Sequence, residues 1–107
     1  MNLFFWKKTK EIDAFARAVA DDLYRHVQPD AARAFVEGEL KKIKKHHQVE
    51  HRLSGVIAEF RRFTQAKSLG LYGKARLQQT FDERLRELGY EPAVTKRLVK
   101  IMLLANP

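Results

Sequence analysis

Large apolar residues recur along this chain at spacings of three and four, and this repeat limits its fold more than any other feature. The clearest stripe begins at Ile12 and holds Phe15, Ala16, Val19, Leu23 and Val27. A helix turns every 3.6 residues, so such a stripe lies on one helical face. Proline stands only at positions 29, 92 and 107, and no period-2 alternation or Asn-Gly turn indicates strands. The pattern predicts an all-α fold, a small four- or five-helix bundle with mostly antiparallel neighbours.

The length sets the domain count. A chain of 107 residues has room for one domain, so residues 1–107 are expected to form a single helical unit. The first helix is predicted over about 10–27, with Thr9 as its N-cap and a proline after Gln28 that ends it. Residues 1–8 would then be an N-terminal aromatic arm.

Residues 30–66 leave two arrangements open. Asp30 is a natural N-cap for a second helix. The stripe of Phe35, Val36, Leu40 and Ile43 lies on a different face from the later stripe that runs from Val49 to Phe63. Either the chain turns near residues 46–48, or one long helix packs different faces against different neighbours. We favour a bend or break, because a helix of that length is unusual in so small a domain.

The second half of the chain carries sharper local signals. Residues 68–73 contain two glycines and predict a loop, followed by a helix over about 74–88. Gly89 suits the left-handed position after that helix, which lets Tyr90 fold back onto Leu85. Pro92 is expected just inside the start of the last helix. The end of that helix is apolar nearly all round, so we expect it to be buried in the core or in a dimer interface.

These stripes predict a core. Its members are the apolar residues at the centre of each helical face: Phe15, Val19, Leu23, Leu40, Leu53, Ile57, Phe60, Leu77, Phe81, Leu85, Leu98 and Ile101.

Composition excludes several classes of function. The chain has no cysteine, which rules out disulfides and thiolate chemistry and fits a reducing compartment. The apolar start is too short for a signal peptide, and no run approaches the length of a membrane span. We therefore expect a cytoplasmic protein. The net charge of +8 is carried by residues 31–67 (nine basic, four acidic) and 68–107 (seven basic, four acidic), and it would attract an anionic partner.

One short sequence motif resembles the signature of a metalloenzyme. His47-Gln-Val-Glu50-His51 matches the H-x-x-E-H zinc-protease signature. Such an enzyme needs a third metal ligand and a substrate cleft, and Lys41–Lys45 is a charge run hostile to a dication. We interpret His46, His47 and His51 as surface or helix-turn histidines. The serines and glycines form no nucleophile or phosphate-binding motif, so we expect no catalytic residues, no cofactor, no metal site, no small-molecule substrate and no enzymatic activity.

Basic residues form one candidate binding stretch. The candidate anion or nucleic-acid contacts are Lys41, Lys42, Lys44, Lys45, Arg52, Arg61 and Arg62. Clustered cations neutralise phosphates, yet no aromatic residue interleaves with these lysines to stack on bases. A solvated helix face explains the same residues. Residues 85–98 also have the length of a helix-turn-helix, but a helical hairpin with a glycine cap accounts for them.

The N-terminus offers a second candidate surface. Leu3, Phe4, Phe5 and Trp6 precede three lysines, and such residues can cap the core, dock on a second subunit or contact a membrane surface. Our first hypothesis for function is a protein-interaction module, with a homodimer or another protein as partner. The alternatives are a basic nucleic-acid binder that uses residues 41–62 and a peripheral membrane protein anchored by residues 4–6.

Overall fold

Five helices make up the fold of the computed structural model, which describes residues 3–38 and 44–105 and, among these, the side chains of residues 7–38 and 47–101. The helices are α1 (Leu3–His26), α2 (Pro29–Val36), α3 (Lys44–Ala66), α4 (Leu71–Glu87) and α5 (Pro92–Ala105). The described residues contain no strand. The prediction of a small all-α bundle is confirmed.

Helix α1 begins earlier than predicted. It starts at Leu3, so Thr9 lies inside the helix and is not its N-cap. Residues 3–8 are the first turns of α1 and not a separate arm. The lysines and the glutamate that follow Trp6 are good helix formers, and they carry the helix through Thr9 without a break.

The break between α2 and α3 also lies earlier than predicted. Helix α2 is preceded by Gln28 in an extended conformation with Pro29 at its first position, so Asp30 is inside the helix and not its N-cap. The helix ends at Val36, and Gly38 has a positive φ of 78°, which glycine adopts at little cost. Residues 46–48 lie within α3. The segment 30–66 therefore holds two helices, and its turn involves the glycine that the stripe pattern overlooked.

The turn from α3 to α4 is shorter than the predicted loop. The backbone N–H groups of Ser68 and Leu69 donate to the carbonyls of Gln65 and Thr64 at 3.2 and 3.0 Å. This is the hydrogen-bond pattern of a Schellman motif, and Ser68 holds the left-handed position with φ 50°. Helix α4 then begins at Leu71 and not near Lys74.

The end of α4 matches its prediction. Gly89 has φ 105°, and the N–H groups of Gly89 and Tyr90 donate to the carbonyls of Arg86 and Leu85, each at 3.1 Å. These two bonds form a second Schellman motif. Pro92 is the first residue of α5, as predicted.

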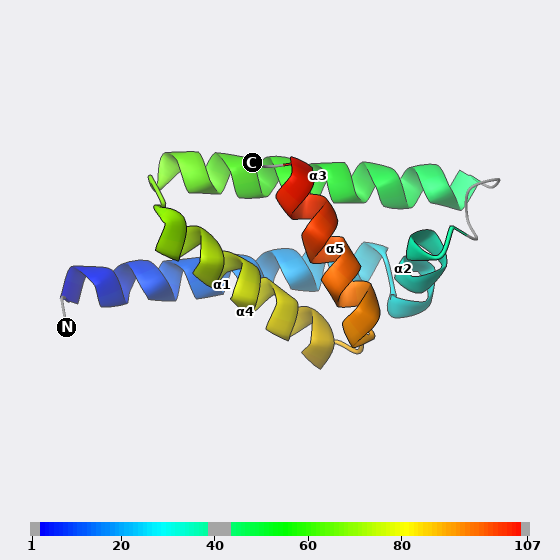
Figure 1. Cartoon of the computed structure of the whole chain (residues 1–107), viewed down its shortest axis with the longest axis horizontal. Coiled ribbons are helices and arrows are strands. Elements are labelled where there is room, and N and C mark those ends of the chain that lie inside the picture. The colour runs from blue at the N-terminus through cyan, green and yellow to red at the C-terminus, as the bar shows by residue number, and fades with distance from the viewer. Residues whose placement is uncertain (1–2, 39–43, 106–107) are drawn as a thin grey trace.

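Helix direction alternates along the second half of the chain but not between α1 and α4. Figure 1 shows α3, α4 and α5 reversing direction in turn, whereas α1 and α4 run the same way and form the most extensive interface. Three hydrogen-bonded pairs share a sequence offset of 63: Asp13 meets Arg76 and Asp21 meets Arg84 between the helices, and Val27 meets Tyr90 just beyond their ends. A constant offset is what two parallel helices of equal rise produce.

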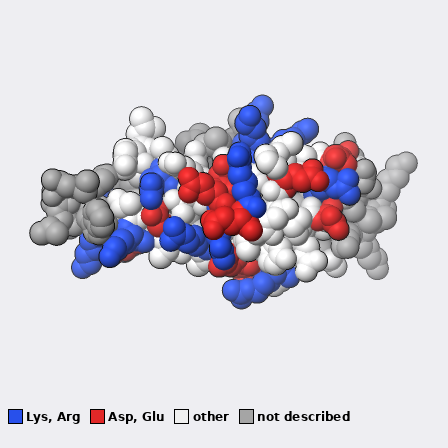
Figure 2. Space-filling model, turned by 90° about the horizontal axis from the view of Figure 1, so that it is seen from below, with Lys and Arg blue, Asp and Glu red and all other residues white. Residues whose placement is uncertain are grey.

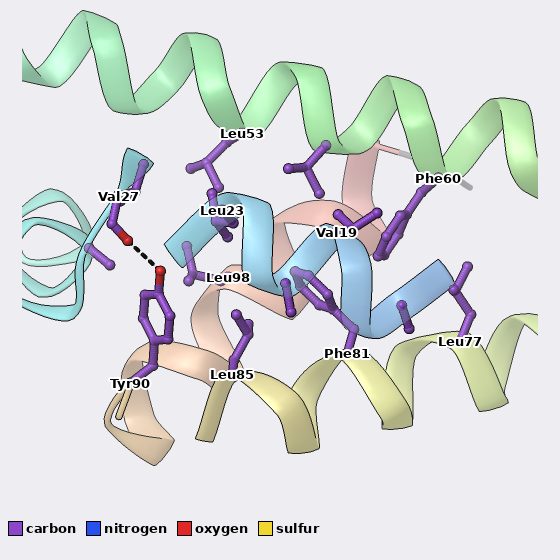
Figure 3. Close-up of a cluster of buried hydrophobic side chains, with 14 of the residues drawn as sticks. Val19, Leu23, Val27, Leu53, Phe60, Leu77, Phe81, Leu85, Tyr90 and Leu98 are labelled. Atoms are coloured by element: carbon purple, nitrogen blue, oxygen red, sulfur yellow. Dashed lines mark hydrogen bonds between the residues drawn. The ribbon is translucent and has the colours of Figure 1, made fainter. Parts of the chain in front are cut away.

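The core lies where α1 packs between α3 and α4 (Figure 3). Phe60 reaches from α3 to Phe81 on α4, with ring centroids 5.0 Å apart. Tyr90 is buried, and its hydroxyl donates to the Val27 carbonyl (Figure 3). Most of the predicted core is confirmed as buried: Val19, Leu23, Leu53, Phe60, Leu77, Phe81, Leu85 and Leu98.

The remaining predicted core residues differ. Phe15 and Ile57 are partly buried against the core, and Phe15 stacks on Phe63 at a centroid distance of 4.0 Å. Leu40 lies outside the described residues. Ile101 was predicted as core, and this is wrong, because its side chain is 38% exposed. Helix α5 packs on α2 and α4, and its buried stripe ends at Leu98, one turn before Ile101.

Candidate functional site

The described part of the predicted basic stretch does not form one patch. Arg52, Arg61 and Arg62 are exposed on α3, but successive residues of a helix are turned by about 100°. Arg52 and Arg61 therefore point to opposite sides of α3. Lys41 and Lys42 lie outside the described residues, as do the side chains of Lys44 and Lys45.

The histidines of the zinc-protease string lie on the first turns of α3. His47 and His51 are exposed, and the side chain of His46 lies outside the described residues. His51 lines a hollow of about 80 Å³ between α1 and α3, which has room for only a few water molecules. No three His, Asp or Glu side chains of the described residues converge as a metal site would require.

The arginines of α4 are occupied by carboxylates. Arg76 donates from Nε and Nη2 to the two oxygens of Asp13 at 2.9 and 2.8 Å, and Arg84 Nε donates to Asp21 at 2.8 Å. Hydrogen bonding by Arg76 holds the pKa of Asp13 below its usual value, and Asp13 in turn raises the pKa of Arg76. Arg86 pairs with Asp82 on its own helix at 3.4 Å. Arg76 and Arg84 thus connect α4 to α1, and the charges of all three arginines are offset by carboxylates of the chain itself.

Charges of both signs lie on the face shown in Figure 2. Acidic side chains gather near the centre of the face, with basic side chains beside them. The net charge of +8 is therefore not spread as one uniform basic surface on this side of the molecule.

Helix α5 has a different kind of basic face. Lys96, Arg97 and Lys100 are exposed on adjacent turns, and none of them has a hydrogen-bond or ion-pair partner among the described residues. The opposite face of the helix buries Val94, Thr95 and Leu98. The buried face fixes the orientation of α5 and leaves its three cations in solvent.

A shallow groove lies beside these cations, between α4 and α5. Its volume is about 570 Å³. Its lining includes Ala75, Gln78 and Gln79 on α4 and Lys96, Val99 and Lys100 on α5, together with the Asp82–Arg86 pair. We call this the α4–α5 groove. It combines an apolar strip, two side-chain amides and two lysines, which can bind apolar side chains, backbone groups and carboxylates respectively.

The predicted N-terminal contacts lie at one end of the molecule. The backbone of the first turns of α1 includes Leu3, Phe4, Phe5 and Trp6. The side chains of these four residues lie outside the part of the chain that the structure describes. Leu71 and Tyr72, on the first turn of α4, are 88% and 61% exposed. In the described parts of the chain, none of the helices combines the length and apolar content that crossing a bilayer requires.

Comparison with family models, curated proteins and solved structures finds no match to this chain.

The sequence alone and the structure draw attention to different basic residues. The sequence prediction rested on the number of cations in the stretch 41–62 and did not include Lys96, Arg97 and Lys100 among the candidate contacts. The signal that distinguishes the two sets is periodicity: the three cations of α5 fall in one sector of the helix, whereas Arg52 and Arg61 do not. Leu71 and Tyr72 were placed in a loop and were not considered as surface contacts.

Proposed function

We propose that this chain is a non-enzymatic protein-interaction module and that the α4–α5 groove receives an acidic segment of a partner protein. One observation supports the proposal above all others. Lys96, Arg97 and Lys100 lie on adjacent turns of α5 with no side-chain partner in the described part of the chain, and two of them line a groove that also has an apolar strip.

The lining of the groove favours a peptide over a nucleic acid. No aromatic side chain lines the described groove, so a base has nothing to stack on. Neutralising about three phosphates would give only weak binding at physiological salt. An amphipathic acidic helix can bury apolar residues against Val99 while its carboxylates meet the lysines.

Fluorescence anisotropy tests the proposal. The probe is a labelled amphipathic helical peptide whose polar face is glutamate. We expect the Lys96→Glu/Lys100→Glu variant to bind it at least tenfold more weakly, because two attractive charge pairs become repulsive. The matched control is Arg52→Glu/Arg62→Glu, which makes the same charge change on α3 and should leave peptide binding within about twofold.

The reverse pattern would reject the proposal. If the α3 control loses peptide binding and the α5 variant keeps it, the groove is not the site. If an oligonucleotide of equal charge binds more tightly than the peptide and with a steeper salt dependence, the nucleic-acid alternative replaces this one. Self-association stays a separate prediction, which light scattering at high protein concentration tests.

A further inference from the structure

A second surface, at the opposite end of α4 from the turn into α5, has a different composition. Because α1 and α4 run in parallel, their first turns lie at the same end of the molecule (Figure 1). The turn from α3 to α4 lies there as well. Six described residues of these segments form what we call the basic tip: Lys7, Lys8, Lys67, Leu71, Tyr72 and Lys74.

The apolar part of the basic tip consists of the two most exposed large hydrophobic residues in the described structure. Leu71 and Tyr72 are adjacent in sequence and are 88% and 61% exposed. Helix α1 continues past this surface, because Glu11 pairs with Lys67 at the end of α3 and α1 begins eight residues earlier, at Leu3. Figure 1 shows these first turns extending beyond the ends of α3 and α4. Their sequence opens with Leu3, Phe4, Phe5 and Trp6.

The charged part of the basic tip is almost entirely positive. Lys7, Lys8 and Lys67 line a groove of about 310 Å³ with Glu11 and Ala66. Glu11, the carboxylate of this groove, lies 3.3 Å from Lys67 and offsets that one charge. The side chains of Lys7, Lys8 and Lys74 have no ion-pair or hydrogen-bond partner among the described residues.

We propose that the basic tip docks on an anionic lipid surface. Exposed aliphatic and aromatic side chains gain free energy at the boundary between headgroups and acyl chains, and each lysine near an anionic leaflet adds attraction. The projecting turns of α1 bring a further apolar sequence to the same end. The bundle would contact the membrane through this end, and the α4–α5 groove would remain accessible to a partner.

A second copy of the chain fits the basic tip less well. A two-fold contact places the same surface of both molecules face to face. The lysines of one tip would then oppose the lysines of the other, with few carboxylates to offset them, and like charges at short distance repel. An anionic surface has the complementary charge.

Vesicle flotation tests the membrane proposal without reference to the peptide site. The vesicles contain phosphatidylcholine with or without phosphatidylserine. We expect the full chain to float only with phosphatidylserine and to dissociate as salt is raised. Leu71→Ser/Tyr72→Ser should weaken binding about tenfold, and Lys7→Glu/Lys74→Glu should abolish its dependence on phosphatidylserine.

Two controls make the result decisive. Ile101→Ser removes an exposed apolar side chain elsewhere, and Arg52→Glu/Arg62→Glu reverses two charges on α3; both should float like the parent chain. Circular dichroism confirms that each variant is folded. Equal flotation with both kinds of vesicle, or flotation unchanged in Leu71→Ser/Tyr72→Ser, overturns the proposal. Light scattering that shows a dimer lost in the same double variant, without flotation, assigns the tip to a second copy.

Discussion

Arg76 on α4 and Asp13 on α1 form a two-pronged ion pair across a distance of 63 residues in sequence, with donor–acceptor distances of 2.9 and 2.8 Å. Eight residues further along both helices, Arg84 meets Asp21 at 2.8 Å. Two pairs at the same offset fix the register of α4 on α1, because sliding either helix by one turn would separate both pairs. The ion pairs therefore specify the alignment of an interface whose free energy comes mainly from apolar burial.

We predict that Asp13→Asn lowers the free energy of unfolding by about 1–2 kcal/mol at neutral pH. The side chain of Asp13 is only 15% exposed, and it also accepts a hydrogen bond from the Thr80 hydroxyl at 2.8 Å. The pKa of Asp13 is held below its ordinary value of 3.8 in the folded state. Its contribution is thus complete above about pH 4 and is lost as the pH falls through the folded-state pKa.

Urea unfolding between neutral and acidic pH measures this effect. Below about pH 4 the stability of the parent chain should fall more steeply than that of Asp13→Asn, because the variant has no carboxylate to protonate. Asp21→Asn is the matched control: its side chain is 36% exposed, so the loss should be smaller. Parallel pH profiles for the parent chain and Asp13→Asn would contradict the assigned role.

The sequence predicts those features that depend on neighbouring residues. Gly89 and Pro92 were placed correctly because a helix cap is a local structure. The same kind of local signal gave a wrong prediction at Gly73, which was assigned to a loop. It lies within α4, and a Cβ there would stand 3.1 Å from the Leu69 Cβ, so this glycine permits a close approach and does not make a turn.

Features that depend on distant residues were not predictable in this way. The parallel packing of α1 on α4 rests on contacts between residues 63 positions apart. The same limit applies to the candidate site. A sequence supplies the number of arginines and lysines. Only the fold shows that Arg76 and Arg84 pair with carboxylates, whereas Lys96 and Lys100 have no such partner within the described ranges.

Two buried threonines give opposite predictions for the same substitution. The Thr95 hydroxyl is buried without a hydrogen-bond partner among the described residues, which costs free energy in the folded state. Thr95→Val should therefore stabilise the chain by about 1 kcal/mol. The Thr80 hydroxyl donates to Asp13, so Thr80→Val should destabilise it by about 1 kcal/mol.

Thermal and urea unfolding of both variants measure this difference. Valine and threonine have similar shapes and similar helix propensities, so the sign of each change reports on the hydroxyl alone. A loss of stability in Thr95→Val would mean that its hydroxyl has a partner, and the interpretation of this position would have to be withdrawn.

The ends of α3 and α4 allow a comparison between the same motif built with two different residues. Both ends form a Schellman motif, but the left-handed position holds Ser68 in one and Gly89 in the other, with φ values of 50° and 105°. A side chain in this conformation costs roughly 1 kcal/mol. Ser68→Gly removes that cost and leaves the unfolded chain more flexible, so we expect a net gain of about 0.5 kcal/mol.

Gly89→Ala makes the reciprocal change and should destabilise the chain by about 1–2 kcal/mol. The new Cβ would lie 3.9 Å from Pro29 Cγ, an ordinary contact, so the loss would arise from the backbone conformation and not from a clash. Urea unfolding midpoints of the two single variants and of the double variant provide the measurement. The sites lie in separate turns, so their effects should add. A destabilised Ser68→Gly variant would show that the serine side chain contributes more to its turn than the left-handed conformation costs.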